Sequence, residues 1–151
     1  MASETENPWD AAFSEARQAA ARGEVPVGAV VVAPDGRIVA RAGNRTIADN
    51  DPSAHAEILA LRAACRLAAS PRLPDHDLYV TLEPCPMCAG ALSFARIRRL
   101  YFSAFDEKGG AVENGVRYFE DPSCHHVPEC YGGLREREAG DLLKAFFAEK
   151  R

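Results

Sequence analysis

The sequence predicts an α/β fold in which helices cover both faces of a sheet. Short apolar runs alternate with segments of helical spacing, and strands that alternate with helices form sheets buried on both sides. The near-continuous apolar run over residues 25–33 is typical of a strand covered on both faces. The length of 151 residues favours one domain. We therefore expect a single domain over residues 1–151 that begins with a flexible segment at 1–7.

The first half of the chain predicts a helix, a strand hairpin and a second helix. Asn7 is a capping residue for the first helix, and Gly23 ends its apolar spacing. A turn sequence at residues 34–36 separates the two apolar runs of the hairpin. In chain order these elements are a helix from residue 8 that stops at 23, strands within 25–33 and 37–42, and a helix that opens at Asp51, Pro52 and Ser53 and ends within 70–75.

The second half predicts two strands and two helices. Pro84 follows an apolar run and breaks its strand, whereas Pro86 suits the first position of a helix. Residues 108–110 form a flexible turn, and no element is predicted for residues 111–133. The predicted elements are a strand at 78–82, a helix from 86 to about 95, a strand at 100–104 and a helix from about 134.

Charge and composition limit the kinds of partner. The chain has 18 basic and 22 acidic residues, a net charge of −4, and it has no polybasic tail, so a nucleic acid would have to be held by a local patch. No apolar run approaches the roughly 18 residues of a membrane span, so we expect no membrane partner. The candidate basic residues are Arg96, Arg98, Arg99, Lys144, Lys150 and Arg151.

The five cysteines favour a reduced compartment. Their number is odd, and the acidic N-terminus resembles neither a secretory signal nor a transit peptide. We therefore expect a cytoplasmic protein whose cysteines bind metal or take part in catalysis.

Two short motifs carry the chemistry. Cys85 and Cys88 form a C-x-x-C pair at the start of the helix that Pro86 begins, where the helix dipole stabilises thiolates. His55 lies near the start of the preceding helix, so one imidazole and two thiolates can converge at one sheet edge. Three protein ligands leave a fourth tetrahedral position for water, as in catalytic zinc sites. Glu57, two residues after His55, is placed to carry a proton between that water and a substrate.

These residues also allow two other interpretations. The cysteine pair alone could be a redox pair, but such a pair has no need of His55 and Glu57. A closed structural zinc site is also possible, because further ligands stand at Cys124, His125, His126 and Cys130. The joint pattern of H-x-E followed by P-C-x-x-C is instead the signature of zinc-dependent nucleobase deaminases.

Beyond these motifs, the chain resembles bacterial tRNA-specific adenosine deaminases. The similarity covers most of residues 8–111 and extends to the last helix; its segments are 25–30, 51–58, 78–91, 96–99 and 106–111. The resemblance implies a three-layer α/β/α fold of the cytidine-deaminase type, with a five-stranded mixed sheet between helices. It also implies a homodimer that hydrolytically converts the wobble adenosine of a tRNA anticodon to inosine and releases ammonia.

The resemblance also implies roles for individual residues. Three of these residues also allow a purely structural role. Asn44 and Asp106 could shape turns, and Phe147 could belong to the core of an amphipathic helix. Ser53 stands where the family commonly has threonine, and residues 112–130 depart from its most familiar pattern. The implied roles are zinc ligation by His55, Cys85 and Cys88, proton transfer by Glu57, and contact with the target nucleotide by Asn44, Asp106 and Phe147.

Two other functions remain open from the sequence. A small-molecule deaminase acting on guanine or a cytosine nucleotide would use the same zinc and the same glutamate. A non-catalytic, zinc-stabilised RNA-binding module would have no use for the Glu57 carboxyl beside an open coordination position.

Overall fold

The computed structural model describes residues 6–149. The predicted flexible segment at 1–7 falls mostly outside this range, as do the basic residues Lys150 and Arg151. Within it, the elements in chain order are α1 (Pro8–Ala21), β1 (Gly28–Val32), β2 (Ile38–Gly43), α2 (Ala56–Ala68), β3 (Asp77–Leu82), α3 (Pro86–Phe94), β4 (Arg99–Ala104), the 3-10 turn η1 (Tyr118–Glu120), β5 (Glu129–Gly132) and α4 (Glu136–Glu149).

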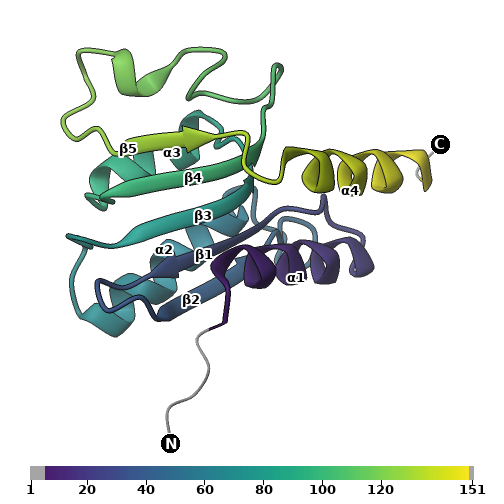
Figure 1. Ribbon diagram of the computed structural model, residues 1–151, viewed down its shortest axis with the longest axis horizontal. Coiled ribbons are helices and arrows are strands. Elements are labelled where there is room, and N and C mark those ends of the chain that lie inside the picture. The colour runs from purple at the N-terminus through teal and green to yellow at the C-terminus, as the bar shows by residue number, and fades with distance from the viewer. Residues whose placement is uncertain (1–5, 150–151) are drawn as a thin grey trace, which may run out of the picture.

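The strands form one mixed sheet in the order β2-β1-β3-β4-β5 (Figure 1). β1 is antiparallel to both β2 and β3, whereas β4 is parallel to both β3 and β5. The predicted hairpin and the predicted five-stranded mixed sheet are confirmed.

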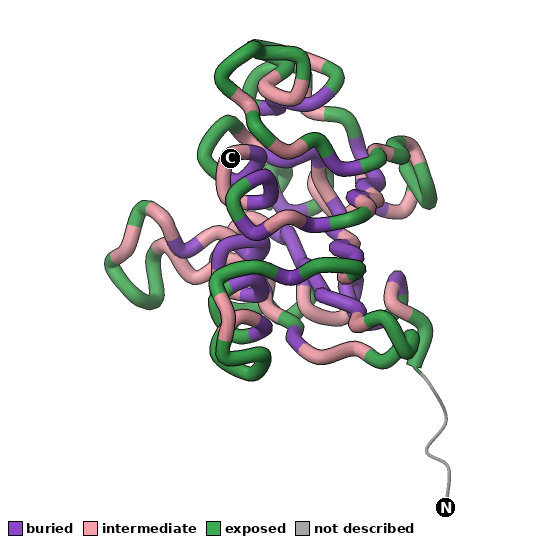
Figure 2. Tube along the Cα trace, turned by 90° about the vertical axis from the view of Figure 1, so that its left-hand side faces the viewer, coloured by how far each residue is buried: buried purple, intermediate pink, exposed green. Residues whose placement is uncertain are grey.

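Helices cover both faces of this sheet. α1 packs on β1 and β2, and α4 packs on β4 beside α1. α2 packs on β2 and β1 from the other side and contacts α3 there (Figure 1). In Figure 2 the buried residues gather in the middle of the molecule, and the exposed residues lie around its outside. The predicted three-layer α/β/α architecture is therefore confirmed.

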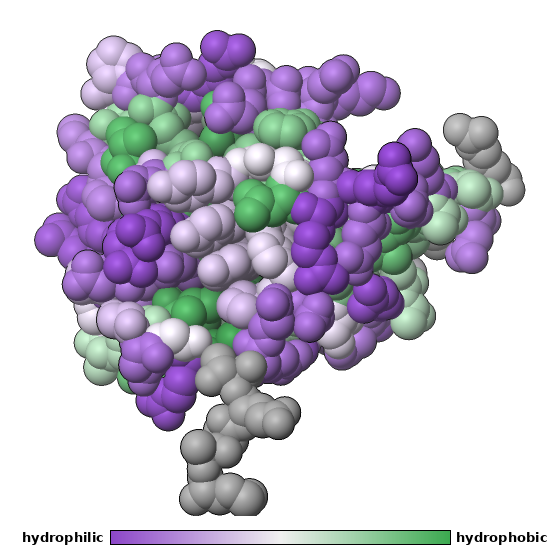
Figure 3. All heavy atoms as spheres, in the orientation of Figure 1, coloured by the Kyte–Doolittle hydropathy of each residue, from purple (hydrophilic) through white to green (hydrophobic). Residues whose placement is uncertain are grey.

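Successive residues of β3 and β4 pack alternately against the two helical layers. Leu78, Val80, Leu100 and Phe102 are fully buried in the cluster that includes the α2 residues. The intervening tyrosines face the α1 and α4 side, where their rings stack across three strands with centroids 4.5 Å and 5.2 Å apart. Figure 3 shows side chains of intermediate hydropathy across the middle of this face. These tyrosines are Tyr79, Tyr101 and Tyr131.

The predicted start of α2 is wrong by a few residues. The helix begins at Ala56, with His55 as its N-cap. Asp51 has a capping side chain, but it closes a turn instead, because its carboxylate accepts bonds from the N–H and hydroxyl groups of Ser53 at 2.9 Å and 2.7 Å.

Residues 111–133, for which no element was predicted, contain η1 and the edge strand β5. The last helix starts at Glu136, slightly later than predicted. Within residues 6–149, none of the helices combines the length and the apolar composition needed to cross a bilayer.

Candidate active site

The sheet brings the starts of α2 and α3 to the same edge. β2 and β3 run in the same direction because each is antiparallel to β1, and a helix follows each of them. His55 is the N-cap of α2, Cys85 is the N-cap of α3, and Cys88 lies in the first turn of α3. The predicted convergence of the three side chains is therefore confirmed.

The three side chains have the spacing of a metal site. Nδ1 of His55 lies 3.6 Å from Sγ of Cys85 and 3.4 Å from Sγ of Cys88. Zinc–ligand distances imply an N-to-S edge of about 3.5 Å in a tetrahedron. Among residues 6–149, this is the one group of such ligands close enough to share an ion, with all three atoms within 4.8 Å of one another. One nitrogen and two sulfurs suit zinc and leave one tetrahedral position for water.

One of the two sulfurs is held as a thiolate, the form that ligates a dication. The hydrogen bond from the Cys88 thiol, assisted by His55, lowers the pKa of Cys85 to about 4. The same contact with the Cys85 thiolate, together with burial, raises the pKa of Cys88. The contact with Cys85 and the charge of Glu57 raise the pKa of His55 against the effect of burial. Cys85 is therefore a thiolate near neutral pH, whereas Cys88 and His55 hold protons that a zinc ion displaces on binding.

Glu57 lies beside the ligands on the first turn of α2. It is only 4% exposed, and its carboxyl group interacts with the Cys88 thiol. Burial raises its pKa to about 7, although the charge of His55 acts in the opposite direction. A carboxyl group with that pKa can both accept and release a proton near neutral pH.

Asn44 reaches the same helix start. Its side-chain oxygen accepts a bond from the N–H group of Ala56 at 2.8 Å, and its amide donates to the carbonyl of Val25 at 3.2 Å. It therefore fixes the start of α2 next to His55. The structure places it beside the metal site, and its contact with a nucleotide stays a prediction.

Asp106 and Phe147 line one cavity of about 650 Å³. Leu82 also lines it, three residues before the ligand Cys85. Phe147 is half exposed, so it does not belong to the core. Asp106 also shapes a turn, because its carboxylate accepts the N–H groups of Lys108 and Gly109 at 3.1 Å and 2.9 Å.

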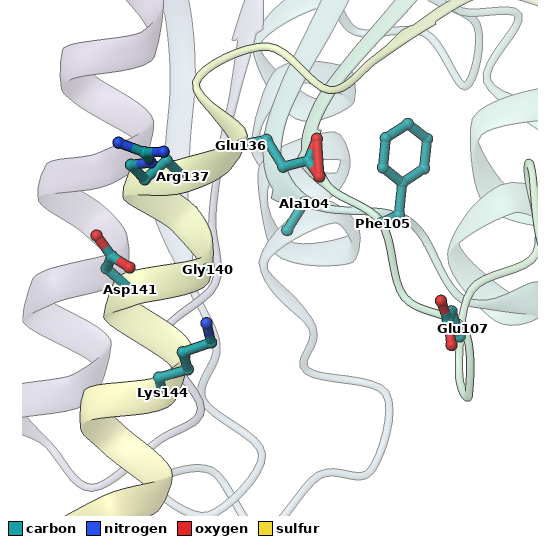
Figure 4. Close-up of a pocket in the computed structure, with 8 residues that line it drawn as sticks. All are labelled: Ala104, Phe105, Glu107, Glu136, Arg137, Gly140, Asp141 and Lys144. Atoms are coloured by element: carbon teal, nitrogen blue, oxygen red, sulfur yellow. The ribbon is translucent and has the colours of Figure 1, made fainter.

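A second groove of about 690 Å³ adjoins this cavity, since Phe105 and Glu107 line both. Figure 4 shows α4 on one side of it and the segment after β4 on the other. Its charges are mixed and do not form a basic surface. They are three acidic residues, Glu107, Glu136 and Asp141, and two basic residues, Arg137 and Lys144.

Two of the candidate basic residues, Arg98 and Arg99, do not adjoin the metal site. Arg98 and Arg99 lie where β4 begins, at the edge opposite the ends of β3 and β4 that lead to the site. Arg98 pairs with Asp77 at 2.8 Å, and Arg99 pairs with Glu129 at 2.8 Å. Each of these two guanidinium groups is thus paired with a carboxylate of its own.

The second group of cysteines and histidines has structural contacts. The Cys124 thiol donates to the carbonyl of His126 at 3.2 Å, and the Ser93 hydroxyl on α3 contacts both residues. A ring nitrogen of His126 lies 2.7 Å from the carbonyl oxygen of Ile97. In the described part of the chain they form no metal cluster, which removes the support for a closed structural zinc site there.

Comparison with known proteins agrees with this site. Residues 2–104, which include all three ligands and Glu57, match the cytidine and deoxycytidylate deaminase zinc-binding region. Over 140 residues, 93% of this chain, it is 61% identical to the tRNA-specific adenosine deaminase of Agrobacterium fabrum, covering 91% of that protein. This chain belongs to the tRNA-specific adenosine deaminase family.

Other members and neighbours extend the comparison. The family member from Bacillus subtilis is 44% identical over 93% of this chain and 86% of its own length. A structure from a study of A-to-I editing by tRNA:A34 deaminases at the wobble position superposes with a TM-score of 0.88 at 59% identity, covering 90% of this chain and 98% of that one. A guanine deaminase from Bacillus subtilis gives a TM-score of 0.62 at 38% identity, with 66% of each chain covered. The predicted zinc-dependent deaminase is confirmed by this family membership.

Proposed function

We propose that this chain hydrolyses the wobble adenosine of a tRNA anticodon to inosine and releases ammonia. The observation that carries the proposal is the set of His55, Cys85 and Cys88 with the buried Glu57 carboxyl beside it. The names of the relatives support the tRNA substrate, since relatives that are 61% and 44% identical to this chain are tRNA-specific adenosine deaminases.

Zinc, when held by the three ligands, supplies an activated water for attack on the ring carbon that bears the amino group. In this reaction Glu57 takes one proton from the water and gives it to the ring nitrogen as the new C–O bond forms. It then carries the remaining hydroxyl proton to the amino group, which leaves as ammonia as the C–N bond breaks and the carbonyl forms. Burial favours the protonated form of this carboxyl group and so suits a residue that must be both protonated and ionised within one cycle. Burial of Glu57 also keeps bulk water from competing for the proton.

The substrate contacts are part of this proposal. Asn44 orients the base beside the metal site, Asp106 contacts the ribose, and Phe147 stacks on a base of the anticodon loop. The shared cavity of Asp106 and Phe147 and the position of Asn44 at the start of α2 support these roles. An anticodon loop is already single-stranded, so its base can reach the metal site at a cost of at most a few kcal/mol.

The domain organisation, the assembly and the compartment are part of the proposal as well. The chain forms one domain over residues 1–151 and acts as a homodimer in the cytoplasm. An apolar groove of about 420 Å³ between α2 and α3 supports the dimer. Phe94, which lines it, is 73% exposed. A second copy seated there would lie against the two helices whose first turns hold the metal ligands.

The test compares four substrates with the zinc-loaded protein: an anticodon stem-loop RNA, free guanine, cytidine and deoxycytidylate. Ammonia release and conversion of adenosine to inosine are measured. We expect turnover of the stem-loop, and none when the same RNA is annealed to a complementary strand that covers the loop. Turnover of a free base or nucleotide alone would reject the tRNA assignment in favour of a small-molecule deaminase. Binding of the stem-loop without turnover of any substrate would favour the non-catalytic, zinc-stabilised RNA-binding module.

A further inference from the structure

Glu83 is a buried carboxylate that gathers five N–H groups. It is 2% exposed and follows β3 directly. One of its oxygens accepts the backbone N–H of Asp106 at 2.9 Å and the side-chain amide of Asn114 at 2.7 Å. The other oxygen accepts the successive backbone N–H groups of Val112, Glu113 and Asn114 at 3.0, 2.8 and 3.0 Å.

These N–H groups take the place of a cation. Among residues 6–149, Glu83 is absent from the ion pairs within 4.0 Å. Successive backbone N–H groups that converge on one oxygen form an anion-binding nest. A buried carboxylate is costly unless such bonds compensate it, so the segment and the carboxylate hold each other in place. The fit is close: a Cβ atom at Gly110 would lie 2.5 Å from the carboxyl carbon of Glu83.

The bonds join two parts of the active site. On one side, Glu83 precedes Pro84 and the metal ligand Cys85. On the other side, the bound segment begins with Asp106, which lines the cavity that it shares with Phe147. A backbone bond from Ala111 to the carbonyl of Pro84 at 2.8 Å reinforces the same connection.

We propose that Glu83 is a positioning residue, which sets the distance between the metal site and the cavity wall that carries Asp106 and so governs substrate binding without touching the substrate. This inference rests on the proposed function for its kinetic part. Its structural part, the anchoring of residues 106–114, can be measured without any substrate.

The primary variant is Glu83→Gln, which keeps the size of the side chain but turns a donor toward N–H groups. We expect kcat/KM for the stem-loop RNA to fall about 10- to 100-fold, mainly through KM, since several charge-assisted bonds are lost. Zinc content should stay at one ion per chain, because the ligands themselves are unchanged.

Asp77→Asn is the matched control at the other end of the same strand. Asp77 is also buried, at 8% exposed, and accepts two bonds from Arg98 at 3.0 Å and 2.8 Å. Its loss should lower the melting temperature but leave KM for the RNA within about twofold of the parent, since the site is remote. An equal rise of KM in both variants would show a general effect of destabilisation and overturn the proposal.

Amide hydrogen exchange measures the anchoring directly. In zinc-loaded Glu83→Gln, the amides of residues 112–114 should exchange at least about tenfold faster than in the parent, while those of β4 keep their protection. Unchanged exchange at 112–114 overturns the proposal. If the parent protein deaminates no stem-loop RNA, the proposed function fails, and the exchange rates still decide whether Glu83 anchors this segment.

A double-mutant cycle tests whether Glu83 acts through Asp106. If it does, Glu83→Gln should reduce kcat/KM by less than about threefold in an Asp106→Ala background, because the contact that it positions is already gone. Zinc-loaded protein is used throughout, at a temperature where the parent and all three variants are folded. Full additivity of the two losses contradicts the positioning role.

Discussion

At the scale of single residues, the two helix N-caps serve the metal site and not their own helices. Neither His55 nor Cys85 makes a side-chain capping bond. For α2 the cap is supplied from a distance, since Asn44 accepts the N–H of Ala56. This division leaves the imidazole of His55 beside the sulfurs. The sequence pattern predicted the ligands, but a cap formed by a residue 12 positions away has no local signal.

Glu57 provides the sharpest test of the chemistry. Glu57→Gln keeps the size of the side chain but removes the proton acceptor, so we expect kcat to fall about 100- to 10 000-fold. Zinc content and melting temperature should stay close to those of the parent, because Glu57 is not among the three ligands. Single-turnover deamination of the stem-loop RNA and metal analysis of the same sample are the measurements. Normal turnover in this variant would contradict the proton-transfer role.

At the scale of elements, the sequence predicted the strands and helices well where buried apolar residues or a proline marked their bounds. The apolar strands β1, β3 and β4 and the proline-started helix α3 lie close to their predicted ranges. β5 escaped prediction because it is a short edge strand with exposed residues and no apolar alternation. Its place comes from pairing with β4, which is a tertiary contact.

Within α4, two adjacent phenylalanines are expected to behave differently. Phe146 is 9% exposed, whereas Phe147 is 50% exposed and lines the cavity with Asp106. Phe147→Ala should raise KM for the stem-loop RNA by roughly tenfold, since stacking of a base on an aromatic ring is worth about 1–3 kcal/mol. Its unfolding free energy should change little.

Phe146→Ala is the matched control. It should lower the free energy of unfolding by about 3 kcal/mol, as expected for a buried aromatic side chain. Denaturant unfolding and steady-state kinetics on both variants separate the two effects. A loss of stability without a change of KM in Phe147→Ala would place that ring in the core and contradict its substrate role.

The loop between β2 and α2 depends on a second buried carboxylate. Glu24 is 1% exposed, and its oxygens accept the N–H groups of Ile47 and Ala48 and the hydroxyl of Thr46. Burial alone would raise the pKa of Glu24, but these bonds outweigh it and hold the pKa below its ordinary value of 4.5. A lowered pKa means that Glu24 stabilises the fold above pH 4.5 and loses this effect as the pH falls through the folded-state pKa.

Glu24→Gln should therefore cost about 1–3 kcal/mol of stability at pH 7, and its deficit against the parent should shrink as the pH falls below 4.5. Glu120→Gln, at an exposed position of η1, is the control and should match the parent across this range. Urea unfolding at several pH values checks the prediction. A deficit that stays constant down to the lowest pH at which both proteins fold would show that the Glu24 charge contributes nothing.

At the scale of the whole molecule, one topological feature assembles the site. Because β1 is antiparallel to both of its neighbours, β2 and β3 deliver α2 and α3 to one edge. The same arrangement leaves the outer sides of these helices with an apolar groove between them. A surface of this kind favours association with a second apolar surface. The metal site and the proposed dimer contact thus derive from the same pair of helices.

The proposed homodimer can be tested at that groove. Phe94→Glu places a charge in the groove, and burying an unpaired charge is strongly unfavourable, so we expect a monomer at micromolar concentration. Leu67→Glu is the control, since Leu67 is 70% exposed on α2 but does not line the groove. Sedimentation of the zinc-loaded proteins should give a dimer for the parent and for Leu67→Glu, and a monomer for Phe94→Glu. A dimer in all three would move the contact away from α2 and α3, and a monomeric parent would reject the homodimer itself.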